Sequence, residues 1–409
     1  MAHSGFLRSN ARWLGAGGLL AFSSSYGQTF FISIFAGEIQ ASFSLSHGAW
    51  GAIYASGTLA AAAVMVWLGA LTDQHRARSL GPWAMGGLAC ACLAMALNPW
   101  VWMLPVFVFA LRLSGQGMLS HISRVAIARW FTATRGKAIA VSSLGFSIGE
   151  ALLPLIFVAL LTVAPWRELW VLTSALALLT IPPLRLLLQT ERTPQSFAAT
   201  YEATGLGNRH WSRTEVLRSP LFWGLVPGLI APPALITAFF FQQVHLAEAK
   251  GLPHLELVAL FPLYSALSVL AMLSTGALID RVGSMRLMPL YLLPLALGFL
   301  ILAGAQSIWT LSLGIGLMAV TAGANNALPA AFWADSFGTR HLGAIKAVAT
   351  ALMVVGSAIG PLFTGFGIDA GFGFPTQMPW ISLYILASIL LLTLSLRRLQ
   401  ATAGLARPT

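Results

Sequence analysis

Two residues that carry a full charge lie deep inside long apolar runs of this sequence. Arg112 lies about ten residues into the run that starts at Val101, and Glu150 about thirteen residues into the run that starts at Gly136. In helices these offsets correspond to depths of ~15 Å and ~20 Å. A charged side chain at the centre of a bilayer costs at least ~2.5–3.5 kcal/mol, so such a residue is a candidate functional residue. We therefore expect Arg112 and Glu150 to meet near mid-depth.

The chemistry open to this pair is the binding of an anion and the carriage of a proton. The guanidinium of Arg112 would hold an anionic group, and Glu150 would act as its counter-ion or as a proton carrier. An anion that engages Arg112 would alter the protonation of Glu150, and this would couple the two events. The alternative is a static ion pair that fixes two helices against each other.

Other polar side chains also lie within apolar runs. His121 follows Arg112 by nine residues and is either a further proton carrier or a structural hydrogen-bonding group. Hydrogen bonds to a substrate are expected from Tyr26, Gln28, Tyr264, Asn325 and Asn326. The alternative for the two asparagines is a hydrogen bond to a neighbouring helix.

The elements that must position these residues follow from the composition. Of the 409 residues, 57% are hydrophobic and 9% are charged, whereas roughly 25% of a soluble globular protein is charged. This excludes a soluble or disordered chain and indicates many membrane-spanning helices of about 20 residues each. We predict an all-α integral membrane protein with twelve spans. They are Trp13–Ala36, Gly48–Leu71, Gly81–Leu97, Val101–Ile122, Gly136–Val163, Leu169–Leu188, Leu221–Val244, Leu257–Ile279, Leu287–Ala303, Ile308–Phe332, Gly343–Phe366 and Trp380–Leu396.

The longest polar stretch, residues 189–219, divides the chain into two sets of six spans. We predict an N-terminal six-helix bundle over residues 1–188, a cytoplasmic linker loop over 189–219, and a second six-helix bundle with a short cytoplasmic tail over 220–409. Neither the linker nor the tail is large enough for a separate folded domain.

Two sequence patterns repeat across this divide. Gly69–Asp73 matches Gly276–Asp280 at an offset of 207 residues, and the GxxxG motif Gly145–Gly149 recurs as Gly356–Gly360 at an offset of 211. Duplicated halves of this kind are a mark of transporter architecture. The two bundles are therefore expected to be pseudo-symmetric.

The basic residues predict the orientation in the membrane. The formal net charge of +11 arises from residues that lie between apolar runs, so it indicates membrane topology and not nucleic-acid binding. With a cytoplasmic N-terminus, all but three of the 23 Lys and Arg residues lie on the cytoplasmic side, the exceptions being Arg112, Arg167 and Lys250. We predict a multi-pass protein of the cell inner (plasma) membrane with both termini cytoplasmic.

The repeated loop resembles a known family signature. The segment Gly69-Ala-Leu-Thr-Asp73-Gln-His-Arg-Ala-Arg78 resembles the loop between spans two and three of the major facilitator superfamily, and Gly276–Arg286 resembles its second copy. The first copy differs from the family pattern at Gln74 and Arg76. The resemblance implies a twelve-helix transporter fold.

In that family the loop Asp braces a cytoplasmic gate. The resemblance implies that Asp73, with Arg76, would face the start of span eleven, and that Asp280, with Arg281, would face the start of span five. A helix N-terminus and a nearby base both attract a carboxylate. The alternative is that these residues are ordinary helix-end charges.

A second resemblance concerns the substrate. Arg129–Ala138, followed by Gly145–Gly149, is similar to the junction of spans four and five in monocarboxylate and oxalate–formate type carriers. Those carriers move small organic anions with protons or by exchange. They often have a basic residue in span eight, and Leu257–Ile279 has none.

The resemblance implies a secondary active transporter that moves a small, monocarboxylate-like organic anion by alternating access, coupled to protons. Its partners would be that substrate, protons and the lipid bilayer, and it would act as a monomer without a cofactor or metal. The alternative is a proton-driven drug or metabolite exporter, in which Glu150 would recognise a cation. Motifs such as HExxH or a P-loop do not occur, so no enzyme is expected.

Overall fold

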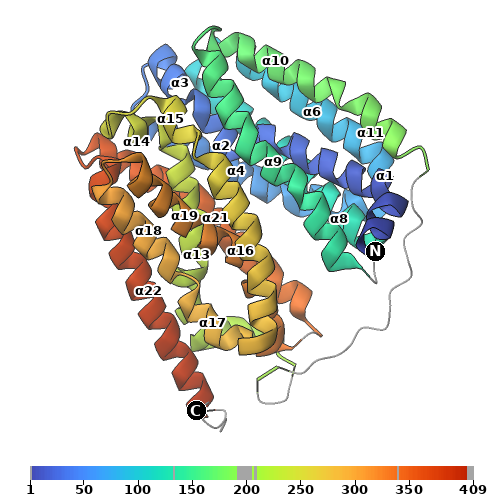
Figure 1. Ribbon diagram of the computed structural model, residues 1–409, viewed down its shortest axis with the longest axis vertical. Helices are drawn as coiled ribbons and strands as arrows, with labels where there is room; N and C mark the ends of the chain where they lie inside the picture. The colour runs from blue at the N-terminus through green and yellow to red at the C-terminus, as the bar shows by residue number, and fades with distance from the viewer. Residues whose placement is uncertain (1, 132–133, 191–204, 207–209, 339, 403–409) are drawn as a thin grey trace. The chain divides into compact units, whose positions relative to one another are not determined.

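The computed structural model describes residues 2–131, 134–190, 205–206, 210–338 and 340–402, and every regular element in these ranges is helical (Figure 1). Eleven helices are long and apolar enough to cross a membrane, or up to twelve if a bent pair near the N-terminus counts as one span. The predicted all-α membrane architecture is therefore confirmed.

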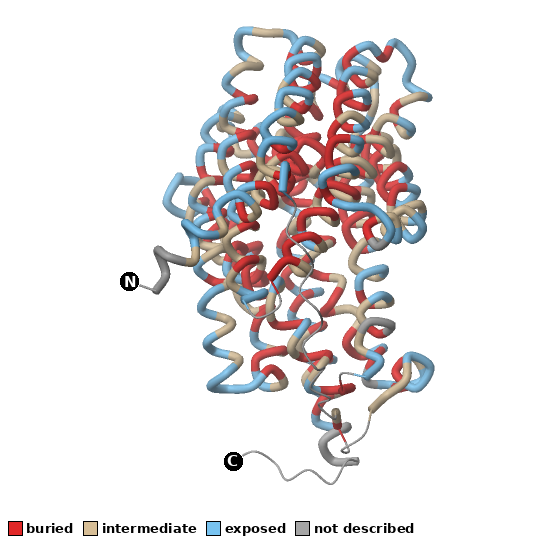
Figure 2. The backbone as a smooth tube through the Cα atoms, turned by 90° about the vertical axis from the view of Figure 1, so that its right-hand side faces the viewer, coloured by how far each residue is buried: buried red, intermediate tan, exposed pale blue. Residues whose placement is uncertain are grey.

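The chain divides into two compact units, Met1–Ala199 with Pro253–Pro262, and Thr200–Leu252 with Leu263–Thr409. The segment Pro253–Pro262 groups with the first unit because α15 (His254–Val258) packs against α9 (Arg135–Leu161). In each unit the buried residues follow the faces that helices turn toward one another, and exposed residues follow the outer faces (Figure 2).

Besides α9 and α15, the first unit contains the other helices that precede the linker. They are α1 (Ala2–Ser23), η1 (Ser24–Gly27), α2 (Thr29–Ile32), η2 (Ser33–Phe35), α3 (Ala36–Phe43), α4 (His47–Leu68), α5 (Leu71–Gln74), α6 (Ala77–Leu97), η3 (Val101–Met103), α7 (Leu104–Leu111), η4 (Arg112–Leu119), α8 (Ser120–Trp130), α10 (Trp166–Leu179) and α11 (Ile181–Leu187).

The second unit begins in the linker. Its helices are α12 (Arg213–Arg218), α13 (Pro220–Phe241), α14 (Gln243–Ala249), α16 (Phe261–Val282), α17 (Ser284–Leu290), α18 (Leu293–Gly304), α19 (Ile308–Asn325), α20 (Leu328–Phe337), α21 (Leu342–Asp369) and α22 (Phe374–Thr402).

Span one is not the single straight helix that the hydropathy pattern predicts. The helical stretches 6–27 and 29–43 meet at an angle of 47°, and Gln28 between them has an extended backbone (φ −88°, ψ 158°). Hydroxyl side chains bond the local backbone here, with Ser24 Oγ donating to the Ala21 carbonyl at 2.7 Å and Ser33 Oγ to the Thr29 carbonyl at 2.6 Å. Such bonds compete with the regular helix ladder and favour a break. We call residues 23–29 the span-one break.

Span four also departs from regular geometry. Its middle turns, η4, form a π-helix, a rare form that appears frequently at functional sites. Gly115 of η4 lies directly against Gly27, and a side-chain carbon at either position would overlap backbone atoms of the other segment. The two glycines therefore allow the span-one break to dock on the π-helix.

The internal repeat has a structural counterpart in each unit. Gly145 of α9 packs on the backbone of Gly18 in α1, and Gly360 of α21 packs on the backbone of Ala234 in α13. In both cases a side chain on the glycine would collide with the opposing carbonyl oxygen. Small residues let membrane helices approach closely, so the recurring GxxxG motif holds span five on span one and span eleven on span seven.

The second unit has breaks of its own. Helix α13 continues through Pro232 and Pro233, and span seven is interrupted at Gln242, between α13 and α14. Gln242 is buried, and its Nε2 donates to Thr364 Oγ1 at 3.1 Å and to the Pro361 carbonyl at 3.5 Å.

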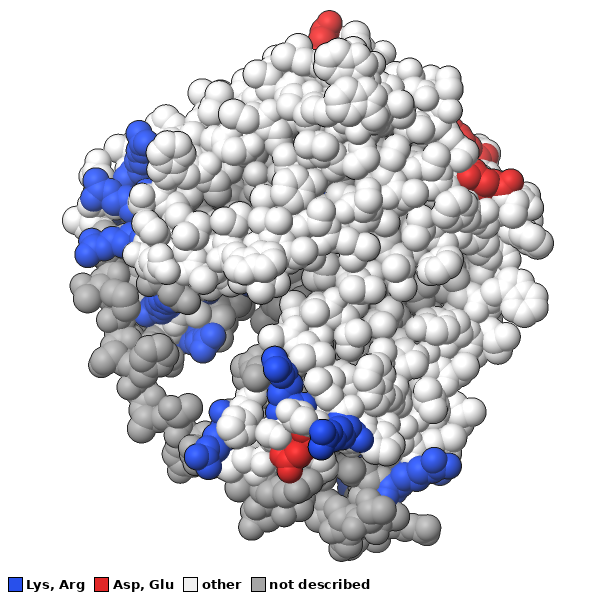
Figure 3. Space-filling view, turned by 180° about the vertical axis from the view of Figure 1, so that it is seen from behind, with Lys and Arg blue, Asp and Glu red and all other residues white. Residues whose placement is uncertain are grey.

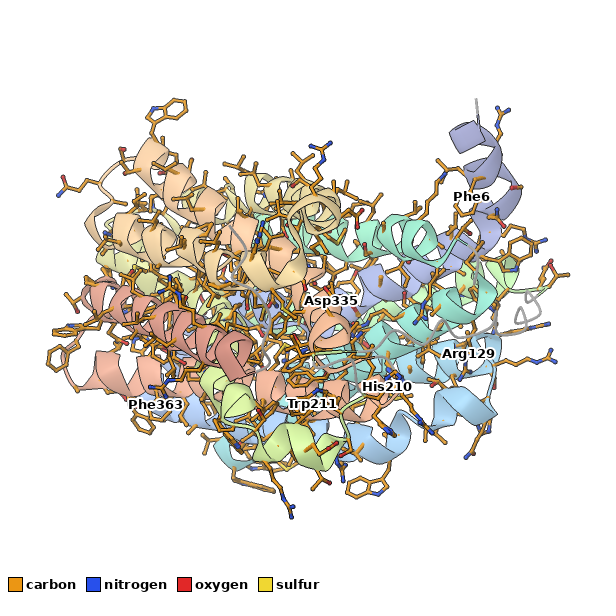
Figure 4. All side chains as sticks on the ribbon, turned by 90° about the horizontal axis from the view of Figure 1, so that it is seen from below. Phe6, Arg129, His210, Trp211, Asp335 and Phe363 are labelled. Atoms are coloured by element: carbon orange, nitrogen blue, oxygen red, sulfur yellow. The ribbon has the colours of Figure 1, made fainter. Side chains whose placement is uncertain are left out.

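The end of the linker docks on the end of span ten. The Leu206 and Trp211 amides donate to the carbonyls of Ser336 and Phe337 at 2.9 Å and 3.0 Å. The Trp211 ring, labelled in Figure 4, makes an edge contact with the ring of Phe337. This part of the predicted linker therefore belongs to the second unit.

Candidate functional site

Arg112 is the first residue of the π-helix, and its side chain is 2% exposed. Its Nη1 donates to the Gly27 carbonyl at 3.2 Å and to Thr29 Oγ1 at 3.4 Å, so the guanidinium is anchored on the span-one break. The guanidinium carbon lies 5.3 Å from the centroid of the Tyr54 ring, a cation–π distance. The hydroxyls of Tyr54 and Thr29 are hydrogen-bonded to each other.

One edge of the Arg112 guanidinium remains available. Within the described part of the chain, the hydrogen bonds of Arg112 all come from Nη1, and its buried Nε has no partner. The hydroxyls of Ser23 and Ser25, at the same break, are also buried without a hydrogen-bond partner among the described residues. Buried polar atoms are rarely left unsatisfied in native proteins. The span-one break is therefore a candidate site for a polar ligand.

Glu150 lies on a helix that packs against the same break. Its side chain is 8% exposed, and the adjacent Gly149 fits directly against Ser25, where a side chain on the glycine would overlap Ser25 Oγ. Arg112 and Glu150 thus lie on two helices, η4 and α9, that both contact η1. The direct polar partners of Arg112 among the described residues are neutral groups.

The other predicted substrate-binding residues fall in both units. Tyr26 is 2% exposed and contacts the rings of Phe22 and Phe31 edge-on, and Gln28 is the half-buried residue at the bend. In the second unit Tyr264 is 3% exposed and lies edge-on to Phe240.

The two predicted asparagines lie where span ten is interrupted, between α19 and α20. Asn326 is exposed, and its Nδ2 donates to the Ala322 carbonyl at 3.2 Å. Asn325 is half-buried, and its Oδ1 has no hydrogen-bond partner among the described residues. One of the two is therefore engaged with its own helix, and the other retains a free acceptor.

The structure places His121 beside the loop signature of the first half. Its Nε2 lies 3.4 Å from Thr72 Oγ1, and the Thr72 carbonyl accepts a hydrogen bond of 2.5 Å from Arg129 Nη1. Arg76 is exposed just before α6, while the side chain of Asp73 lies outside the described residues. His121 thus packs against the end of span two, some distance along the helix from Arg112.

The second copy of the signature has a different environment. Asp280 and Arg281 are exposed at the end of α16, and Gly283 has φ +86°, a conformation that favours glycine. Ser284 Oγ then donates to Asp335 Oδ2 at 2.5 Å. The contacts predicted for Asp73 with the start of span eleven and for Asp280 with the start of span five stay predictions.

Three partners of Arg112 were not predicted from the sequence, namely Gly27, Thr29 and Tyr54. The segment Ser23–Thr29, with three successive serines, is unusually polar for the middle of a span, and this could have indicated the break. No comparable signal marks Tyr54. Among the described residues, no group of three or more His, Cys, Asp or Glu side chains could hold a metal ion.

Comparison with known proteins places this geometry in a family. The sequence matches the Major Facilitator Superfamily over residues 17–303 and 246–405. It is 28% identical over 302 residues, 73% of each chain, to an uncharacterized 38 kDa protein in the 23S RNA operon of Thermoproteus tenax.

Solved structures share the fold. A bacterial homolog of the human lysosomal transporter Spinster, in an inward-facing and occupied conformation, has a TM-score of 0.69 at 16% identity and covers 97% of both chains. A mutant of the nucleoside transporter NupG has a TM-score of 0.68 at 14% identity, over 95% of this chain and 99% of the other. With the family match extending over most of its length, this chain belongs to the major facilitator superfamily.

Proposed function

We propose that this transporter carries a small, monocarboxylate-like organic anion across the inner (plasma) membrane by alternating access, and that protons drive the movement. The observation that carries the proposal is the environment of Arg112, a cation 2% exposed whose hydrogen-bond acceptors are neutral. A buried charge without a counter-charge is strongly unfavourable. An anionic substrate would relieve that cost, and this supports an anion as cargo.

The available edge of the guanidinium supports a carboxylate. A guanidinium can bind the two oxygens of a carboxylate through two parallel N–H groups, and Nε with Nη2 form such an edge. In Arg112 this edge is the one left without hydrogen bonds in the described part of the chain. The unpartnered hydroxyls of Ser23 and Ser25 supply further donors at the same break.

Glu150 supports proton coupling. Among the Lys, Arg, Asp and Glu residues whose burial is described, Arg112 and Glu150 are the two that are buried. A substrate anion at Arg112 would use the positive field that otherwise favours the ionised form of Glu150, so Glu150 would take up a proton. Anion and proton would then move together without adding net charge to the buried site.

The orientation follows the distribution of basic residues, with both termini cytoplasmic. Figure 3 shows a surface that is mostly free of charge, with Lys and Arg confined to a few clusters. A surface of this kind suits lipid contact.

The test is transport by the purified full chain in proteoliposomes with an imposed pH gradient. A panel of small carboxylates is compared with the corresponding neutral amides and with cationic dyes. We expect accumulation of a carboxylate, collapse of that accumulation when a protonophore is added, and no binding of the amide. Accumulation of cationic dyes without any carboxylate would instead identify a proton-driven exporter and overturn the anion proposal.

A further inference from the structure

We infer that Thr29 and Tyr54 are positioning residues that fix the plane of the Arg112 guanidinium and thereby select planar, two-oxygen anions over tetrahedral ones. This inference rests on the proposed function. Neither residue was among the sequence candidates, and both are buried, with Thr29 8% and Tyr54 0% exposed.

The first step of the argument is the hydroxyl of Thr29. Its Oγ1 accepts from Arg112 Nη1 at 3.4 Å and is also hydrogen-bonded to the Tyr54 hydroxyl. Thr29 begins α2 directly after the bend, and its carbonyl is bonded by Ser33 Oγ. The hydroxyl therefore occupies a fixed point on the span-one break.

The second step is the number of constraints on the guanidinium. The Gly27 carbonyl and Thr29 Oγ1 both accept from the same nitrogen, Nη1, which removes that nitrogen from substrate binding. The ring of Tyr54 covers the guanidinium at 5.3 Å. The two acceptors that hold Nη1 and the aromatic ring beside the guanidinium together fix the plane of the group. Nε and Nη2 therefore present one defined edge.

The third step concerns what such an edge can recognise. A carboxylate places both oxygens in the guanidinium plane and satisfies two parallel N–H groups. A sulfonate has a third oxygen out of that plane, which needs a further donor. The N–H groups of the guanidinium all lie in its plane, and Thr29 and Gly27 hold that plane through Nη1, so the group cannot tilt toward the third oxygen. Release of Nη1 should therefore make the site more tolerant of tetrahedral anions.

The experiment compares a transported aliphatic carboxylate with the sulfonate of the same carbon chain, as competitors of uptake in proteoliposomes. Thr29→Val keeps the shape and removes the hydroxyl, Thr29→Ser keeps the hydroxyl, and Tyr54→Phe keeps the ring. We expect Thr29→Val and Tyr54→Phe to reduce the carboxylate-over-sulfonate preference about tenfold. Thr29→Ser should retain the preference of the wild type.

Two matched variants control for the loss of any buried hydroxyl. Thr173→Val removes a fully buried hydroxyl that bonds the Leu169 carbonyl, and Tyr291→Phe removes a buried phenol hydroxyl in the second unit that bonds the Gly228 carbonyl. Both should leave the preference unchanged. Thermal unfolding followed by tryptophan fluorescence checks that every variant is folded. If Thr29→Val does not fold, Tyr54→Phe serves as the test.

The outcomes separate the inference from the proposed function. If Arg112→Ala still prefers carboxylates as the wild type does, the proposed function itself fails. If Arg112→Ala loses carboxylate binding while Thr29→Val and Tyr54→Phe keep the full preference, only the positioning inference fails. A reduced preference in both controls would likewise overturn it, because the effect would then be one of general packing.

Discussion

The two halves of this transporter share a scaffold and differ in charge. In both halves a glycine of the GxxxG motif packs on the backbone of the first span, Gly145 on Gly18 and Gly360 on Ala234. Yet Arg112 and Glu150, the buried charged residues among those described, both lie in the first half. The buried polar groups described in the second half are neutral, and Gln242 is one of them, bonded to Thr364 and to the Pro361 carbonyl.

The repeat offsets show where the halves diverged. An offset of 207 residues places Ala319 opposite Arg112, and an offset of 211 places Pro361 opposite Glu150. Ala319 is fully buried, so the second half uses that position for packing. A helix–helix contact depends on small size, which duplication preserves, whereas a buried charge is retained only where function requires it. The comparison teaches that the scaffold was duplicated and the ionic chemistry was not.

The largest expected effect comes from removing the positive charge of the first half. Arg112→Ala should abolish transport of the anion, a loss of at least ~100-fold, because the lost charge-assisted bonds are each worth ~1.5–3 kcal/mol. Arg112→Lys should recover little, since a lysine ammonium lacks the two-pronged geometry of the guanidinium. Uptake into proteoliposomes is the measurement.

A double variant distinguishes a binding site from a structural ion pair. If Arg112 and Glu150 only stabilise each other, Arg112→Met with Glu150→Gln should restore both folding and transport, because no unpaired charge remains. We expect folding without transport. Recovered transport would show that the charge difference between the halves has no role in substrate binding.

The next effect concerns the proton. Glu150→Gln keeps the shape of the side chain and removes its titratable group, so it should eliminate pH-driven accumulation while leaving exchange at equal pH within a few-fold of the wild type. Counterflow and pH-jump uptake on the same vesicles separate the two activities. Preserved accumulation under a pH gradient would remove Glu150 from the coupling mechanism.

A smaller effect should be the same in both halves. Gly145→Ala and Gly360→Ala each place a methyl group on an opposing carbonyl oxygen, and overpacking typically costs ~1–3 kcal/mol. We expect similar reductions in thermal stability for the two variants, with unchanged preference among anions in whatever transport remains. A large change in anion preference for Gly360→Ala would show that the contact of Gly360 with Ala234 is not purely structural.

Much of this arrangement could be predicted from the sequence. The apolar runs predict the helical membrane fold, and the cost of charge at depth singles out Arg112 and Glu150, both of which are buried. The repeated loop and GxxxG motifs predict the duplication. These features can be read from a short stretch of sequence or from a single charged residue, and they do not depend on which distant residues come into contact.

The partners of Arg112 could not be predicted in the same way. Hydropathy averaged over a span does not report the bend at Gln28 or the π-helix at Arg112–Leu119, because both are backbone events within a continuous apolar run. Thr29 reaches Arg112 only because Gly27 docks on Gly115, a contact between residues far apart in the chain. His121 is a further example, because its spacing from Arg112 in the sequence gave no indication that it would contact Thr72.

The smallest expected effect concerns a second shared feature of the halves, the capping of equivalent helices by a basic side chain. Arg167 donates to the carbonyls of Ala96 and Asn98 at 2.8 Å and 2.6 Å at the end of α6, and Lys250 donates to the carbonyl of Ala303 at 2.7 Å near the end of α18. These helices form spans three and nine. Basic groups at a helix C-terminus satisfy its last carbonyls, which gives both residues a structural role.

The two caps should differ in strength. Arg167 bonds two carbonyls and also lies over the ring of Trp166, so Arg167→Met should lower the free energy of unfolding by ~1–2 kcal/mol, and Lys250→Met by less than ~1 kcal/mol. Burial lowers the pKa of Lys250, so the unfolded chain binds its proton more readily than the folded chain does. Stability contributed by Lys250 should therefore rise as the pH increases from the lowered pKa toward the ordinary lysine value, and Lys250→Met should lack that rise. Thermal unfolding at several pH values measures both effects, and equal losses for the two variants at every pH would contradict the assignment of Arg167 as the stronger cap.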